Sequence, residues 1–232
     1  MDHGNEGRIV DIEPPQYYPG MRATEAVVFD YGGVIITSIA NKVQRVADRH
    51  EVDLLTMLEV LMGPRHESTD HPWHQSERGE IWVSDVQQSL GPAAELAGIT
   101  LDGTEIDELM DSMTYSYVDE SLAMINEIAA GPLKLGLLTN LNLDFRETLE
   151  AELDLTKFDA VIDSAVEGTR KPEVRIYEIV EERLGVHGEA IIYLDDFDHN
   201  LRPATKRGWR TIHVTDPATA MQQLRTALTS PS

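Results

Sequence analysis

Five short apolar runs, spread from residue 25 to residue 214, constrain the fold of this chain more than any other feature. They are residues 25–30, Leu133–Leu138, Phe158–Ile162, Ala190–Leu194 and Thr211–Val214. Helical patterns follow four of them, near residues 142–153, 173–185, 198–207 and 217–229. Mostly apolar strands that alternate with helices are typical of a parallel sheet covered on both faces. The sequence therefore predicts an α/β fold with a doubly wound parallel sheet.

The segment between the first two runs is too long for a single crossover. Residues 39–129 show apolar positions at helical spacing, interrupted by glycine–proline steps. A parallel crossover needs only about a dozen residues. We therefore expect a helical cap over residues 39–129, inserted into an α/β core formed by residues 24–38 and 130–232. Residues 1–23 are polar and turn-rich and are expected to form an N-terminal arm.

Polar motifs stand at or just beyond the ends of several predicted strands. Asp30 ends the first strand, Thr139 follows the second, and the pair Asp195–Asp196 follows the fourth, while Lys171 lies in a loop. The carboxyl ends of strands in a doubly wound sheet meet at one crevice. A carboxylate nucleophile, a hydroxyl, a lysine and paired carboxylates form a coherent set for phosphoryl transfer with Mg²⁺. Each residue alone is more often a turn former, a helix cap or a solvated loop residue, so the argument depends on the set.

These motifs, in this order, make the chain resemble the haloacid dehalogenase (HAD) superfamily. The subgroup with a helical cap after the first motif is the most similar, and it includes epoxide hydrolase N-terminal phosphatase domains and glucose-1-phosphatase-type sugar phosphatases. Supporting stretches are Ser76–Ile81, Arg170–Tyr177 and Leu194–Asn200. The resemblance implies a HAD-like Rossmannoid core and a Mg²⁺-dependent phosphatase that hydrolyses a small, sugar phosphate-like metabolite through an aspartyl-phosphate intermediate.

The resemblance also implies the metal ligands. Asp30 would be both nucleophile and ligand, and the backbone carbonyl of Gly32 would be a second ligand. Asp196 would bind the metal directly. Asp195 would bind Lys171 or a metal-bound water, although the two aspartates could exchange roles.

The remaining site assignments concern phosphate and substrate. Thr139 would bind the phosphoryl group with Asn140 beside it, and Lys171 would orient nucleophile and phosphate. Asn200 matches a position that supports the metal ligands from outside. We assign Gly32, Gly33, Asn140, His66 and His74 to substrate binding. For the two cap histidines, the simpler alternative is that they belong to a polar surface loop.

Gly32 departs from the usual superfamily pattern. Most members have a second Asp there, which protonates the leaving group, and general acid–base help contributes about 10²–10⁴-fold. Three alternatives follow: hydrolysis aided by a cap side chain, solvent or an activated leaving group; a reaction that needs no acid; or a catalytically silent protein that binds a ligand or partner. His66 and His74 are the candidate substitutes for the acid.

Composition limits the partners. A formal net charge of −22 argues against nucleic acid, whose phosphates are bound by clustered lysine and arginine. No apolar stretch approaches the ~20 residues of a membrane span, and the N-terminus lacks the basic and apolar regions of a secretory signal. The absence of cysteine fits a reducing compartment, so we expect a cytoplasmic protein. The sequence makes no prediction of the oligomeric state.

Overall fold

The computed structural model describes residues 23–110 and 115–229, and its centre is a parallel sheet of five strands. The strands are β1 (Ala26–Phe29), β2 (Lys134–Thr139), β3 (Ala160–Asp163), β4 (Ile191–Asp195) and β5 (Arg210–His213). Their order across the sheet is β3-β2-β1-β4-β5, and every pair is parallel. The doubly wound α/β fold expected from the sequence is confirmed. The first strand lies at the centre, between β2 and β4.

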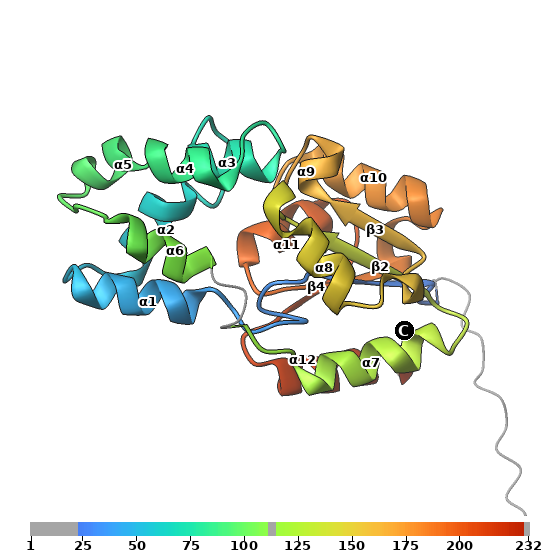
Figure 1. Cartoon of the computed structure of the whole chain (residues 1–232). Coiled ribbons are helices and arrows are strands. Elements are labelled where there is room, and N and C mark those ends of the chain that lie inside the picture. The colour runs from blue at the N-terminus through green and yellow to red at the C-terminus, as the bar shows by residue number, and fades with distance from the viewer. Residues whose placement is uncertain (1–22, 111–114, 230–232) are drawn as a thin grey trace, which may run out of the picture.

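Helices cover both faces of this sheet (Figure 1). Side chains of β1 alternate between the faces: Val27 and Phe29 join one apolar cluster, while Ala26 and Val28 join the other. On the first face pack α7 (Asp119–Ala129), α8 (Arg146–Glu152) and α12 (Pro217–Thr229); on the second pack α10 (Val174–Leu184) and α11 (Asp198–Lys206). Burial on both faces explains why the strands are continuous apolar runs.

Short elements complete the core. They are α9 (Ser164–Glu167) and three 3₁₀ turns, η2 (Leu143–Phe145), η3 (Leu155–Lys157) and η4 (Gly188–Ala190). Sequence patterning did not predict α9, which is a single turn begun by the Asp163 side chain. That carboxylate accepts a hydrogen bond from the Ala165 amide at 3.0 Å.

In the part of the cap that the structure describes, six helices are present, and the cap has an apolar cluster of its own. They are α1 (Ala40–Arg49), α2 (Leu54–Met62), α3 (Pro72–Glu77), α4 (Val83–Ser89), α5 (Gly91–Leu96) and α6 (Gly103–Met110). In Figure 1 the cap stands beside the carboxyl edge of the sheet. Its entry and return segments lie side by side, because Ile36 pairs with Tyr117 in an antiparallel bridge. The inserted segment thus leaves and rejoins the core at one point.

One part of the expected cap packs with the core instead. Helix α7 lies within the predicted range 39–129, but its buried Met124, Ile125 and Ile128 belong to the cluster on the sheet. It contacts β2 and α12, and Figure 1 shows it along the sheet beside α12. Among the described residues, the cap helices therefore lie between Ala40 and Met110, and residues 115–129 pack with the core. The predicted arm lies almost wholly outside the described residues.

None of the helices described in the structure combines the length and the apolar character that a membrane span requires.

Candidate active site

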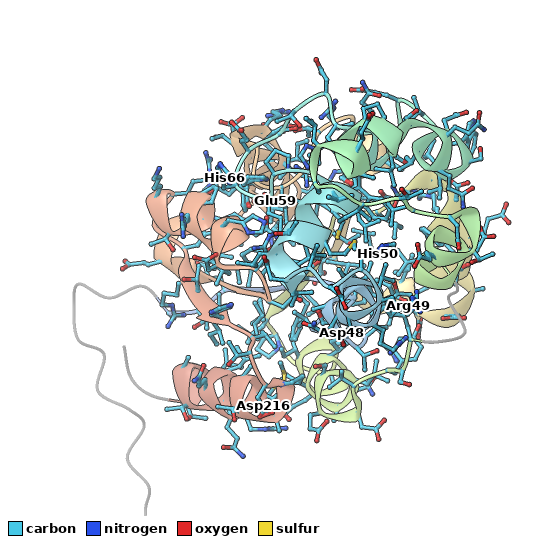
Figure 2. The ribbon with its side chains drawn as sticks, turned by 90° about the vertical axis from the view of Figure 1, so that its left-hand side faces the viewer. Asp48, Arg49, His50, Glu59, His66 and Asp216 are labelled. Carbon is cyan, nitrogen blue, oxygen red and sulfur yellow. The ribbon has the colours of Figure 1, made fainter. Side chains whose placement is uncertain are left out.

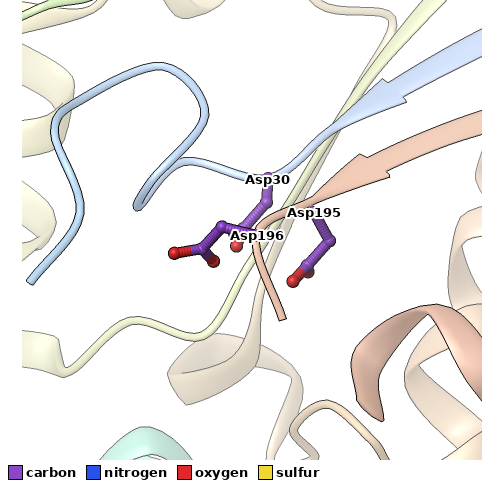
Figure 3. Close-up of side chains that lie close together, drawn as sticks. All are labelled: Asp30, Asp195 and Asp196. Atoms are coloured by element: carbon purple, nitrogen blue, oxygen red, sulfur yellow. The ribbon is translucent and has the colours of Figure 1, made fainter. Parts of the chain in front are cut away.

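Two neighbouring strands, β1 and β4, bring the predicted acidic residues together. Phe29, which precedes Asp30, is in register with Leu137 of β2 on one side and Leu194 of β4 on the other. Asp30 and Asp195 consequently stand at adjacent strand ends, with Asp196 one residue beyond (Figure 3). Ligand atoms of the three carboxylates lie within 4.8 Å of one another. Among the described residues, this group has the arrangement of a metal site.

Lys171 links two of these carboxylates. Its side chain is 1% exposed, and its Nζ lies 2.8 Å from Asp30 Oδ1 and 2.7 Å from Asp195 Oδ2. Burial alone would lower the pKa of Lys171, but Asp195 and Asp30 raise it above its ordinary value. The lysine is therefore a fixed cation beside the nucleophile position.

Asn140 holds the loop that carries Lys171. Its Oδ1 accepts a hydrogen bond from the Lys171 amide at 2.8 Å, and its Nδ2 donates to the Lys171 carbonyl at 3.1 Å. The sequence assigned Asn140 to substrate binding. The structure places it on the cavity wall with both side-chain polar atoms engaged by Lys171, so it positions the lysine. Thr139 lines the cavity at the end of β2 and is 2% exposed.

Asp195 is fully buried and its carboxylate is saturated with donors. Oδ1 accepts from the Phe197 amide at 2.8 Å and from Asn200 Nδ2 at 3.0 Å. Oδ2 accepts from Lys171 and from the Tyr193 hydroxyl. Such a carboxylate orients its neighbours. Asn200, expected to support the ligands from outside, contacts Asp195 directly.

Asp196 has the opposite character. Its Oδ2 accepts only from Ser38 Oγ at 3.0 Å, and its buried Oδ1 has no partner among the described residues. Burial, together with the charge of Asp195, raises the pKa of Asp196 to about 7. Burial also raises the pKa of Asp30 well above its ordinary value, in spite of Lys171. Buried carboxylates with an orphaned oxygen fit a hard divalent cation such as Mg²⁺.

The two glycines after the nucleophile position have different reasons to be glycine. Gly33 has a φ of +72°, and a Cβ there would lie 2.1 Å from Asp196 Oδ2. The turn therefore needs a glycine to pack against that carboxylate. Gly32 lines the cavity, and a Cβ there would meet no atom within 4 Å. Position 32 has room for a side chain.

The structure does not bring the two predicted cap histidines to the cavity. His66 is exposed on the loop after α2, as Figure 2 shows on the cap side of the molecule. His74 is fully buried: its Nδ1 accepts from the Thr69 amide at 3.0 Å, and its Nε2 packs against Gly63. Burial, with the charge of Arg170, lowers the pKa of His74 to about 3. Neither residue lines the cavity, so neither is placed to substitute for an acid at position 32.

The cavity beside these residues has a volume of about 190 Å³ and mainly apolar walls. Aliphatic and aromatic side chains that line it are Tyr31, Ile36, Ile39, Met62, Trp73, Tyr115, Tyr117, Leu141, Phe145, Leu149 and Phe197. They come from the loop after β1, the cap, the return segment before α7, the segment after β2 and the turn after β4. This chamber was not predicted from the sequence, because its lining residues are far apart in the chain.

Three further polar lining residues were missed as site residues. Arg65 lies 5.5 Å from the Phe197 ring, and Arg170 binds Glu77 through its Nε at 2.6 Å. His199 also lines the cavity, and burial lowers its pKa to about 4. The sequence signal for Arg170 is its place directly before Lys171.

A model of the haloacid dehalogenase-like hydrolases matches residues 24–206. The chain belongs to this family. That match spans the core and the cap together, and it confirms the resemblance inferred from the motifs.

Curated relatives are mostly much longer than this chain. Acyl-CoA dehydrogenase family member 10 of Mus musculus is 29% identical over 218 residues, which cover 92% of this chain and 20% of that protein. Bifunctional epoxide hydrolase 2 of Rattus norvegicus is 28% identical, covering 87% and 38%. Sesquiterpene phosphatase astK of Aspergillus oryzae is 28% identical, covering 87% and 95%.

Solved structures share the fold. An L-2-haloacid dehalogenase superposes with a TM-score of 0.65 at 19% identity, covering 90% of this chain and all of that one. A HAD family enzyme of Bacteroides thetaiotaomicron, in complex with magnesium and inorganic phosphate, gives 0.57 at 18% identity, covering 82% and 94%. These identities support the architecture alone.

Proposed function

We propose that this hydrolase is a Mg²⁺-dependent phosphatase that forms an aspartyl phosphate on Asp30. The observation that carries the proposal is the buried Asp30 carboxylate, held 2.8 Å from the Lys171 ammonium beside a second, partly unsatisfied carboxylate, Asp196. A lysine and a cation neutralise phosphate charge so that an anionic nucleophile can approach.

Each residue has a separate role in this proposal. Asp30, Asp196 and the carbonyl of Gly32 would hold Mg²⁺, whose charge would stabilise the phosphoryl oxygens. Asp195 keeps Lys171 charged and aimed at Asp30, at 2.7 Å from its Nζ. Thr139, at the adjacent strand end, would donate its hydroxyl to a phosphoryl oxygen.

The reaction would proceed in two displacements. A carboxylate oxygen of Asp30 bonds to phosphorus as the bond to the leaving oxygen breaks. Water then attacks the aspartyl phosphate, which restores the carboxylate, releases phosphate and passes one proton to solvent. Lys171 remains protonated throughout, since two carboxylates raise its pKa.

The walls of the cavity favour an apolar organic group over the sugar phosphate that the sequence suggested. Sugar hydroxyls require many hydrogen-bonding side chains, whereas this chamber is lined mainly by aliphatic and aromatic groups. The relative from Aspergillus oryzae, which carries the name sesquiterpene phosphatase, is consistent with this choice. We therefore propose a phosphate that carries an apolar organic group as the substrate.

The test is phosphate release from p-nitrophenyl phosphate and a panel of apolar and sugar phosphates, with Mg²⁺ and with EDTA. We expect turnover that EDTA abolishes and Asp30→Asn removes. Asp198→Asn is the matched control, because this carboxylate is exposed on α11 and binds Arg202. Release no faster than that of Asp30→Asn would refute the phosphatase and favour a silent ligand-binding protein. Metal-independent halide release from 2-haloacids would instead favour a dehalogenase, the activity named for two other relatives.

A further inference from the structure

We propose that this enzyme selects phosphates whose leaving oxygen is weakly basic, so that it departs without receiving a proton from the protein. Aryl phosphates, acyl phosphates and phosphoanhydrides share this weakly basic leaving oxygen, and we expect the substrate to carry an apolar group as well. The inference rests on the proposed phosphatase function and deepens it, because it names the kind of leaving group.

The first observation is the empty space at position 32. Gly32 lines the cavity two residues after the nucleophile, and a Cβ there would meet no atom within 4 Å. Its backbone lies outside the left-handed region, in contrast to Gly33, so a side chain would be accepted without strain. Glycine is therefore not required at position 32 by packing. With glycine at position 32, open cavity occupies the space where a proton-donating side chain could lie.

The second observation is that the cap does not replace the missing acid. His66 is exposed and His74 is buried, and neither lines the cavity. His199 does line it, but its pKa of about 4 leaves the imidazole neutral at pH 7. The positions of His66 and His74 thus exclude them as proton donors to the leaving group. His199 is excluded because its imidazole is neutral at pH 7.

Two carboxylates and a phenol also line the cavity, from Glu77, Glu152 and Tyr31. Glu77 accepts from Arg170 Nε at 2.6 Å and from Trp73 Nε1 at 2.8 Å, so both of its oxygens are engaged. Glu152 is exposed to solvent. The Tyr31 hydroxyl faces that of Tyr117 at 3.4 Å, and the experiment examines Tyr31 because it directly follows Asp30 in the chain.

The consequence concerns the first displacement. When the bond from phosphorus to the leaving oxygen breaks, its electron pair stays on that oxygen as an oxyanion. An alkoxide is a strong base and needs a proton at that moment, whereas a phenolate, carboxylate or phosphate does not. Because general acid help is worth about 10²–10⁴-fold, the missing acid slows alkyl phosphates by that factor and weakly basic leaving groups much less.

The experiment compares kcat/KM for p-nitrophenyl, phenyl and benzyl phosphate, in order of rising basicity of the leaving oxygen. Benzoyl phosphate and an alkyl diphosphate are assayed beside them, to separate the acyl and anhydride sources. For the native enzyme we expect kcat/KM to fall at least ~10²-fold from p-nitrophenyl to benzyl phosphate. The variant Gly32→Asp should raise the benzyl phosphate value by ~10-fold or more and change the p-nitrophenyl value far less.

Gly32→Asn is the matched control, since it fills the same space without an ionisable proton. It should leave the steep dependence in place, and Tyr31→Phe should do the same. The inference is overturned by equal kcat/KM values for benzyl and p-nitrophenyl phosphate, by identical effects of Asp and Asn at position 32, or by a steeper dependence in Tyr31→Phe. Absence of phosphate release from every substrate would instead refute the phosphatase function itself.

Discussion

A buried ion pair between Glu77 and Arg170 joins the cap to the loop that carries Lys171. Glu77 lies on α3, and its carboxylate accepts from Arg170 Nε at 2.6 Å. The side chains are 4% and 6% exposed. Arg170 precedes Lys171, so we expect the substitution Glu77→Gln to weaken the attachment of the cap next to the active site.

The magnitude follows from the burial of the pair. Removing one partner of a buried ion pair leaves an uncompensated charge and costs about 3–5 kcal/mol. An exposed pair contributes about 0–1 kcal/mol. Arg175 and Glu182 form such a pair at 2.7 Å, with 53% and 58% exposure. Glu182→Gln is therefore the matched control, with the same chemical change in an exposed setting.

The assay is urea unfolding at pH 7, which reports the free energy of unfolding of each variant. We expect Glu77→Gln to lose about 3–5 kcal/mol and Glu182→Gln less than about 1 kcal/mol. Adding Arg170→Met to Glu77→Gln should recover part of the loss, because the unpaired charge is removed. Equal losses for the two single variants would refute the idea that this pair anchors the cap.

Two further predictions concern stability. His74 has a folded pKa of about 3 against an ordinary 6.5, so the unfolded chain binds its proton first and stability falls as pH drops from 6.5 towards 3. By pH 4 this loss of stability amounts to roughly 3 kcal/mol. In unfolding titrations, His74→Asn, which keeps an acceptor for Thr69, should lessen the loss of stability in acid, and His66→Asn is the exposed control. An unchanged acid profile in His74→Asn would contradict the burial of His74. Gly33→Ala should lower the free energy of unfolding by at least ~1–2 kcal/mol through its positive φ and its contact with Asp196, whereas Gly32→Ala should change it by less than ~0.5 kcal/mol. Melting temperatures of the two variants report this difference. Equal melting temperatures for the two alanine variants would contradict the distinction between the glycines.

Local patterning was sufficient to predict the sheet. The run Val27–Phe29 is apolar at every position because β1 is buried on both faces at the centre of the sheet. The helix stop at Ala130–Pro132 was also predicted, and α7 ends at Ala129. These features depend on neighbouring residues in the chain, so the sequence alone contains them.

The convergence of the polar residues was also predictable. Parallel strands place their carboxyl ends at one edge, so Asp30, Thr139 and Asp195 were expected at the same edge once the sheet was inferred. The strand order β3-β2-β1-β4-β5 makes them neighbours. Which aspartate is saturated and which keeps a free oxygen was not predictable. That difference depends on Tyr193, Asn200 and the Phe197 amide, all of which donate to Asp195.

The sequence by itself determined the α/β fold, the family and the set of residues at the strand ends, because each follows from local pattern and strand direction. Only the tertiary structure decided that α7 packs on the core and that His74 is enclosed in the cap. It also decided that the chamber beside Asp30 is apolar. Helical periodicity shows that a face is buried but not against which partner, and a cavity is defined by residues that only folding brings together.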